Sequence, residues 1–133
     1  MIKDPAGLPS LVLAYVGDAV FEVYVRTHLV EGKYKNVHDL HDKAVSFVSS
    51  RAQAGFYKRL EPAMTEGERA IAKRGRNAKS HRVPKSARTL EYRLSTGFEA
   101  LIGYLFLSGQ KERLEQLVGH ILNEEVSFED HEL

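Results

Sequence analysis

The chain has 133 residues, of which 43% are hydrophobic, and its formal net charge at pH 7 is +1. This length fits a single domain, residues 1–133, with an ordinary core. The sequence has no cysteine, which excludes disulfides and thiolate metal sites. The N-terminus lacks the apolar run of an export signal, and the longest mainly apolar stretch, residues 8–25, carries two acids. We therefore expect a cytoplasmic protein without a membrane span.

Apolar residues recur at helical spacing along almost the whole chain, which predicts an all-α fold. Asp4 followed by Pro5 is typical of a helix N-cap with proline in the first turn. A long helix is expected over residues 10–30. Asn36 can cap a second helix that runs to about residue 51. Residues 52–60 either continue this helix or form one of their own.

The second half of the chain is also mainly helical. Thr65 and Glu68 have the spacing of a capping box, in which each side chain bonds the other residue's backbone N–H, and a short helix into Lys73 should follow. Three further elements are expected: a loop over 74–85, where Gly75 and Pro84 stand among few apolar residues, and helices over 86–107 and 111–124. The acidic tail, residues 127–133, is expected to fray.

The near-neutral net charge hides one strongly basic segment. Residues 73–93 contain eight basic residues and one acid, a net charge of +7, whereas the rest of the chain has 11 basic and 17 acidic residues, a net charge of −6. Such a block either binds a polyanion or lies solvated in a loop. The contrast with the acidic remainder favours a polyanion.

Two apolar helices carry acids beside small residues. Asp18 follows Gly17 in the first helix, and Glu99 lies close to Gly103 in the later one. Glycine inside a helix costs about 1 kcal/mol relative to alanine, so it suggests that another backbone approaches closely. Two carboxylates with room for water between helices suit Mg²⁺. Alternatively, each acid pairs with a basic side chain or caps a backbone group.

The same residues carry a resemblance to a known family. Residues 13–20 read Leu-Ala-Tyr-Val-Gly-Asp-Ala-Val, and residues 99–103 read Glu-Ala-Leu-Ile-Gly. Both motifs, in this order in an all-helical chain, resemble the ribonuclease III family over roughly residues 8–122. The chain ends at Leu133, without room for the double-stranded-RNA-binding domain of full-length members, so it looks like the single-domain Mini-III subfamily.

This sequence departs from the family pattern at three acidic positions. The family has a glutamate where Ala14 stands, an aspartate where Thr96 stands, and a carboxylate at the position of Leu11. Only Asp18 and Glu99 can therefore be carried over as catalytic and metal-binding residues. The number of metal ions stays open. His38 and His41 lie three residues apart on an expected helix, but they lack a third ligand.

The resemblance implies a ribonuclease III catalytic-domain fold and metal-assisted hydrolysis of double-stranded RNA, leaving a 5′-phosphate and a 3′-hydroxyl. The implied cofactor is Mg²⁺, with Mn²⁺ as a substitute. A precursor of 23S ribosomal RNA is the implied substrate, a homodimer the implied assembly, and a ribosomal protein a candidate accessory factor. Apolar residues around Tyr15, Phe21, Phe98 and Phe106, which exceed the needs of one small core, also favour a dimer.

Without a separate RNA-binding domain, the basic segment is expected to hold the RNA, because phosphate contacts position a duplex by its shape. The candidate RNA-binding residues are Lys73, Arg74, Arg76, Lys79, Arg82, Lys85 and Arg88. Two alternatives remain: a ribonuclease III fold that only binds RNA or ribosomes, and an unrelated helical adaptor for an acidic protein. The second alternative does not explain acids within apolar helices.

Overall fold

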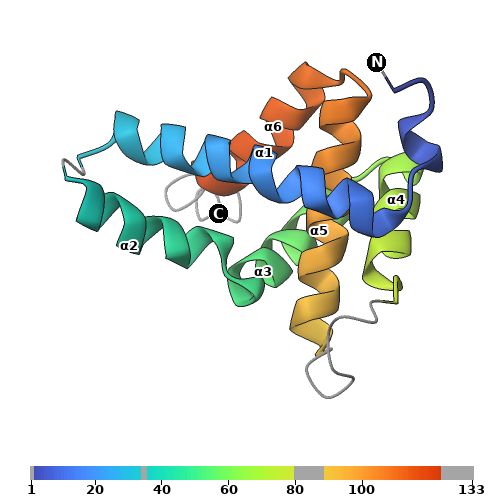
Figure 1. The fold of residues 1–133 in the computed structure, drawn as a ribbon, viewed down its shortest axis with the longest axis horizontal. Coiled ribbons are helices and arrows are strands. Elements are labelled where there is room, and N and C mark those ends of the chain that lie inside the picture. Colours follow the sequence, from blue (N-terminus) through green and yellow to red (C-terminus); the bar gives the residue numbers. More distant parts are fainter. Residues whose placement is uncertain (1, 34–35, 80–88, 124–133) are drawn as a thin grey trace.

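The structure is a computed structural model that describes residues 2–33, 36–79 and 89–123. Over these ranges the chain is helical and has no strand, as the apolar pattern predicts. In chain order the elements are η1 (Pro5–Gly7), α1 (Ser10–Glu31), α2 (Val37–Val48), α3 (Ser50–Leu60), η2 (Glu61–Ala63), α4 (Glu66–Arg76), α5 (Leu90–Leu107) and α6 (Lys111–Leu122), shown in Figure 1.

The helix starts follow the capping residues in the sequence. The Asn36 side chain accepts a hydrogen bond from the backbone N–H of Asp39, as expected of a cap for α2. The Ser49 hydroxyl accepts from the N–H of Ala52 and starts α3, so residues 50–60 form a helix of their own. The predicted capping box of Thr65 and Glu68 is present at the start of α4. Local hydrogen bonding thus sets three of the helix starts.

Several predicted boundaries are wrong. Asp4 and Pro5 begin only a short 3₁₀ helix, and the Asp4 side chain makes no capping hydrogen bond. Residues 74–76 belong to α4, because Gly75 packs closely on α5, where a Cβ would lie 2.9 Å from Cα of Gly97. Thr89 has an extended backbone and caps α5. Helix α6 ends at Leu122, two residues before the predicted end at residue 124. The expected tail, residues 127–133, lies outside the described ranges.

Helix α5 is the centre of the fold and packs against α1, α3 and α4. Figure 1 shows α5 crossing α1, with α4 close to the N-terminal segment. Phe21, Phe56 and Phe98 join α1, α3 and α5 in a ring cluster, in which the Phe21 and Phe98 centroids lie 4.9 Å apart, edge to face. Aromatic pairs in such edge-to-face arrangements contribute about 1 kcal/mol beyond the burial of their area. The cluster therefore fixes how α1 lies across α5.

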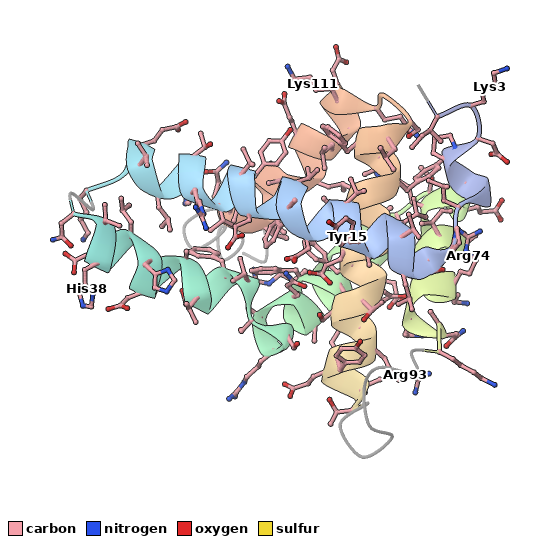
Figure 2. All side chains as sticks on the ribbon, in the orientation of Figure 1. Lys3, Tyr15, His38, Arg74, Arg93 and Lys111 are labelled. Atoms are coloured by element: carbon pink, nitrogen blue, oxygen red, sulfur yellow. The ribbon has the colours of Figure 1, made fainter. Side chains whose placement is uncertain are left out.

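The apolar surplus divides between the core and the surface. Phe21 and Phe98 are fully buried, whereas Tyr15 is 81% exposed and Phe106 is 53% exposed. Figure 2 shows Tyr15 on the outer side of α1. Among the described helices, none is long and apolar enough to span a membrane.

Candidate active site

Two glycines let α1 and α5 meet backbone to backbone. A Cβ at Gly17 would overlap the carbonyl oxygen of Glu99 and lie 2.8 Å from the amide nitrogen of Gly103. A Cβ at Gly103 would in turn overlap the carbonyl oxygen of Leu13. The prediction that Gly17 marks a close approach of another backbone is therefore confirmed.

This crossing brings Asp18 and Glu99 together. Asp18 follows Gly17 directly and is exposed, whereas Glu99 lies one turn before Gly103 and is partly buried. Burial, and then the negative charge of Asp18, raise the pKa of Glu99 to about 8. Both favour the uncharged form of Glu99, and so does hydrogen bonding with the Asp18 side chain. Without a cation, Glu99 therefore favours its protonated form at neutral pH.

A divalent cation fits this pair. Two neighbouring carboxylates repel each other when both are ionised, and a bound cation removes that repulsion. Mg²⁺ is commonly held by one or two carboxylates while it keeps several waters. Within the described ranges, no three or more His, Cys, Asp or Glu side chains form a group that could hold a metal ion. His38 and His41 therefore belong to no such group either. The remaining ligands would thus be water or substrate phosphate.

Of the three missing family acids, two are replaced by buried residues, whereas Leu11 is exposed on α1. Ala14 is buried among apolar side chains that include Leu13 and Ile71. Thr96 is buried as well, and its hydroxyl donates to the carbonyl of Tyr92 in the preceding turn. None of these three residues offers a charged oxygen, so Asp18 and Glu99 remain the acids of the two motifs.

Gln53 is a site residue that our sequence analysis missed. This side chain of α3 is 1% exposed, and its Oε1 accepts a hydrogen bond from the hydroxyl of Ser95 at 3.2 Å. The amide group also lies near enough to Glu99 to lower the pKa of that residue, against the effect of burial. The sequence held one signal for Gln53. This residue lies three, four and seven residues before Phe56, Tyr57 and Leu60, so a polar side chain shares the buried apolar face of α3.

The candidate RNA-binding residues differ in their surroundings. The Arg74 guanidinium donates to the carbonyl of Ala6 at 2.7 Å, the carbonyl of Leu8 at 2.9 Å and the hydroxyl of Ser10 at 3.2 Å, so it holds the N-terminal segment (Figure 2). Arg93, which belongs to the basic segment but is not one of these candidates, donates to the last carbonyl of α4, that of Arg76. The remaining candidates divide by place: Lys73 and Arg76 lie on α4, Lys79 is exposed after it, and Arg82, Lys85 and Arg88 lie outside the described residues.

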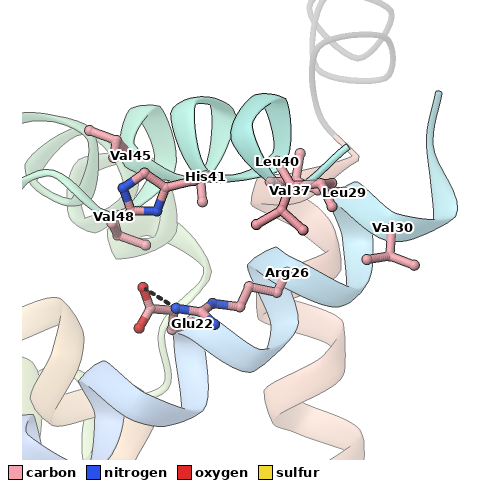
Figure 3. Close-up of a pocket in the computed structure, with 10 residues that line it drawn as sticks. Glu22, Arg26, Leu29, Val30, Val37, Leu40, His41, Val45 and Val48 are labelled. Carbon is pink, nitrogen blue, oxygen red and sulfur yellow. Dashed lines mark ion pairs between the residues drawn. The ribbon is translucent and has the colours of Figure 1, made fainter. Parts of the chain in front are cut away.

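A separate hollow of about 220 Å³ lies between α1 and α2 (Figure 3). Its walls are mainly valine and leucine, and Glu22 pairs with Arg26 at 3.5 Å on the α1 side. His41 also faces this hollow, whereas His38 pairs with Asp42 on the exposed side of α2. Neither Asp18 nor Glu99 lines the hollow, so it is distinct from the carboxylate pair.

Known proteins resemble this chain over most of its length. A family model described as the ribonuclease III domain matches residues 11–110. The chain is 51% identical to the Mini-ribonuclease 3 of Symbiobacterium thermophilum, over 88% of this chain and 90% of that protein. It is 46% identical to the Mini-ribonuclease 3 of Enterococcus faecalis, with the same two coverages. A crystal structure of a Fusobacterium nucleatum protein superposes with a TM-score of 0.80 at 28% identity, over 94% of this chain and 100% of that one.

Proposed function

Since the chain belongs to the ribonuclease III family and is an endoribonuclease, we propose that it cuts double-stranded RNA with Mg²⁺, or Mn²⁺ in its place, held by Asp18 and Glu99. One observation carries this proposal: carboxylates from α1 and α5 face each other where glycines bring the two backbones together. We take residues 1–133 as one nuclease domain.

Each carboxylate has a distinct part in this chemistry. When bound, the cation lowers the pKa of a coordinated water and stabilises charge on the attacking and leaving oxygens of the phosphodiester. Asp18 is exposed, so it offers a charged oxygen at the surface that RNA approaches. Glu99 is partly buried and gives up its proton to become the second ligand. No histidine is needed as a base.

Substitution of the two acids tests this assignment. Asp18→Asn and Glu99→Gln should abolish cleavage of a long RNA duplex in Mg²⁺ while the circular dichroism of the protein stays unchanged. Glu22→Gln is the matched control, because Glu22 is an acid on the same helix that pairs with Arg26 instead. Near-normal cleavage by either site variant at saturating Mg²⁺ would show that the site lies elsewhere.

Three finer proposals complete this function. We propose a precursor of 23S ribosomal RNA in the cytoplasm as the natural substrate, supported by the similarity to Mini-ribonuclease 3, and a ribosomal protein as candidate accessory factor. We propose that the basic residues of segment 73–88 hold the duplex by its phosphates, with Arg74 contributing mainly through the fold. Finally, we propose a homodimer that places one site on each strand.

The support for a dimer is an open apolar groove of about 610 Å³ beside the carboxylate pair. Side chains of α1 and Phe106 of α5 line this dimer groove: Tyr15, Val16, Asp18, Ala19, Val20, Val23, Tyr24 and Phe106. Tyr15 and Val23 are 81% and 64% exposed, and clustered apolar exposure of this kind marks interaction surfaces. Because Asp18 borders the groove, a second copy there would lie directly beside the site.

A further inference from the structure

The Gln53 amide is held from one side only. Its oxygen accepts from Ser95, which is itself buried, and this bond turns the nitrogen Nε2 in the other direction. Nε2 is buried and has no well-formed hydrogen bond to any described residue. Leaving a buried donor unsatisfied costs about 1–3 kcal/mol, so the working state of the protein should supply an acceptor.

Glu99 is the acceptor within reach. The Gln53 side chain favours the charged form of Glu99, as expected of a donor that faces a carboxylate. Asp18 on α1, the other carboxylate of the site, also acts on Glu99, and its charge raises the pKa of that group. Glu99 therefore interacts with two groups, the buried amide of Gln53 on α3 and the carboxylate of Asp18 on α1.

We propose, resting on the proposed function, that Gln53 is a positioning residue whose Nε2 donates to one oxygen of the ionised Glu99 carboxylate and turns the other oxygen toward Asp18 and the cation. Ser95 fixes the amide in this orientation through Oε1. Groups that hydrogen-bond a metal ligand orient it, and their loss typically costs about 10- to 100-fold in metal affinity or activity.

A neutral amide suits this role better than a charged side chain. Lysine or arginine at residue 53 would neutralise Glu99 and compete with the cation for it, whereas glutamine orients the carboxylate and leaves its charge available. The chain carries no acid at residues 14 and 96, and within the described ranges no third histidine, aspartate or glutamate joins Asp18 and Glu99 in a group that could hold a metal ion. With so few ligands, the orientation of each contributes more to affinity.

Direct titration with Mn²⁺ in the absence of RNA tests the proposal. Gln53→Met keeps the volume but removes the donor, and we expect it to weaken Mn²⁺ binding about 10- to 100-fold, measured by electron paramagnetic resonance. Cleavage by this variant should return toward the wild-type rate as Mg²⁺ is raised, because orientation rather than a ligand is lost. Gln116→Met, at an exposed glutamine of α6, controls for the substitution.

The outcomes separate the role of Gln53 from the metal site itself. A folded Gln53→Met with wild-type Mn²⁺ affinity overturns the proposal. If this variant does not fold, Ser95→Ala replaces it: the amide stays but loses its anchor, a several-fold weaker affinity is expected, and unchanged affinity again overturns the proposal. Mn²⁺ binding that depends on Asp18 but not on Gln53 refutes only the positioning role. A wild-type protein that binds no Mn²⁺ refutes the metal site as well.

Discussion

The Glu99 carboxyl group holds a proton that a cation must displace. Its pKa of about 8 follows from burial and from the charge of Asp18, so below that pH the protonated form dominates. We therefore expect Mn²⁺ and Mg²⁺ affinity to rise as pH increases from about 6 to about 8 and to level off above, with release of a proton. Calorimetry in buffers of different ionisation enthalpy counts that proton. Glu99→Gln should remove the pH dependence, and a flat affinity in the wild type would contradict it.

The same shift sets the sign of a stability effect. The pKa of Glu99 in the folded state is raised above its ordinary value of 4.5, so the native state holds more protons between 4.5 and about 8. This group therefore contributes stability at low pH that is lost as pH rises through that window. A cation that replaces the proton reverses the loss, so Mn²⁺ should raise the melting temperature more at high pH than at low pH.

Individual site residues differ in how far the sequence predicts them. Gly17, Asp18 and Glu99 stand out because an acid or a glycine is unusual within an apolar helix. Gln53 does not stand out, because its partner Ser95 is 42 residues away. Arg74 was assigned to RNA by the charge pattern, yet its hydrogen-bond acceptors lie 64 or more residues earlier. Charge runs predict a polyanion surface but cannot identify the arginines that the fold itself uses.

The crossing of α1 and α5 depends on the absence of a side chain at Gly17. Alanine there would overlap the Glu99 carbonyl, so the helices must separate. We expect Gly17→Ala to lower the free energy of unfolding by about 3 kcal/mol or more, as overpacking against backbone does. Gly55→Ala is the matched control on α3, where a Cβ meets nothing within 4 Å, and it should stabilise by about 1 kcal/mol. Equal effects in urea unfolding would refute the crossing.

Glu68 links the start of α4 to α6. Its carboxylate accepts two hydrogen bonds from Arg113, both at 2.8 Å, and one from the backbone N–H of Thr65 at 2.9 Å. These bonds hold the pKa of Glu68 below its ordinary value, against burial. Because Arg113 is partly exposed, we expect Glu68→Gln to cost only about 2 kcal/mol of unfolding free energy near neutral pH.

The acid side of the stability curve provides the control for Glu68. A depressed pKa contributes stability above the ordinary value of 4.5 that is lost as pH falls through the folded-state value. The difference between wild type and Glu68→Gln should therefore shrink as urea unfolding is repeated from neutral pH down to about pH 3. A difference that stays constant over this range would mean that the charge of Glu68 contributes little.

Elements were predicted better than their contacts. Periodicity and caps predict α1 to α3 and the start of α4 closely, because both act within a few residues of sequence. The pattern misplaced the end of α4, since Gly75 is a usual stop signal and its packing against Gly97 depends on the tertiary fold. Whether a segment is helical depends mainly on nearby residues, whereas the helix it packs against depends on residues far away in the sequence.

For the whole molecule, the dimer groove should decide the oligomeric state. Val23→Glu and Phe106→Glu each place a charge in the apolar lining, and both should give a monomer mass by light scattering at micromolar concentration. Val37→Glu is a control at another exposed valine, 81% exposed on α2 and outside this groove. A wild-type protein that is monomeric at every concentration would contradict the dimer, and a dimer in both groove variants would place the interface elsewhere.

The all-α class and the ribonuclease III fold could both be predicted over most of the chain, because the helical periodicity and the two family motifs agree there. The uneven charge was visible too, with +7 over residues 73–93 and −6 elsewhere. The number of these charges free for RNA could not be predicted, since Arg74 and Arg93 bond to the protein itself. A test of RNA binding must therefore treat these two arginines separately.

Electrostatic binding of RNA by the basic segment predicts a countable salt dependence. Each phosphate contact contributes roughly one unit to the slope of log affinity against log salt, so replacing Lys79, Arg82 and Lys85 by alanine should flatten the slope by about two to three units. Duplex affinity should also fall, measured in Ca²⁺, where we expect cleavage to be slow. Lys79 is exposed beyond α4, and Arg82 and Lys85 belong to a stretch that the sequence predicts as a loop, so we expect this change to leave the core intact.

Arg74→Ala separates charge from fold in the same assay. Arg74 bonds Ala6, Leu8 and Ser10, so its loss should lower thermal stability while changing the salt slope by much less than one unit. Binding of single-stranded RNA gives the remaining comparison. If the protein recognises the shape of the duplex, its affinity for single strands should be lower, whereas purely electrostatic binding should give both forms a similar affinity. If the variant with Lys79, Arg82 and Lys85 replaced keeps the wild-type duplex affinity and salt slope, the RNA is held by another surface. If Arg74→Ala flattens the salt slope by a full unit, the Arg74 guanidinium contacts a phosphate.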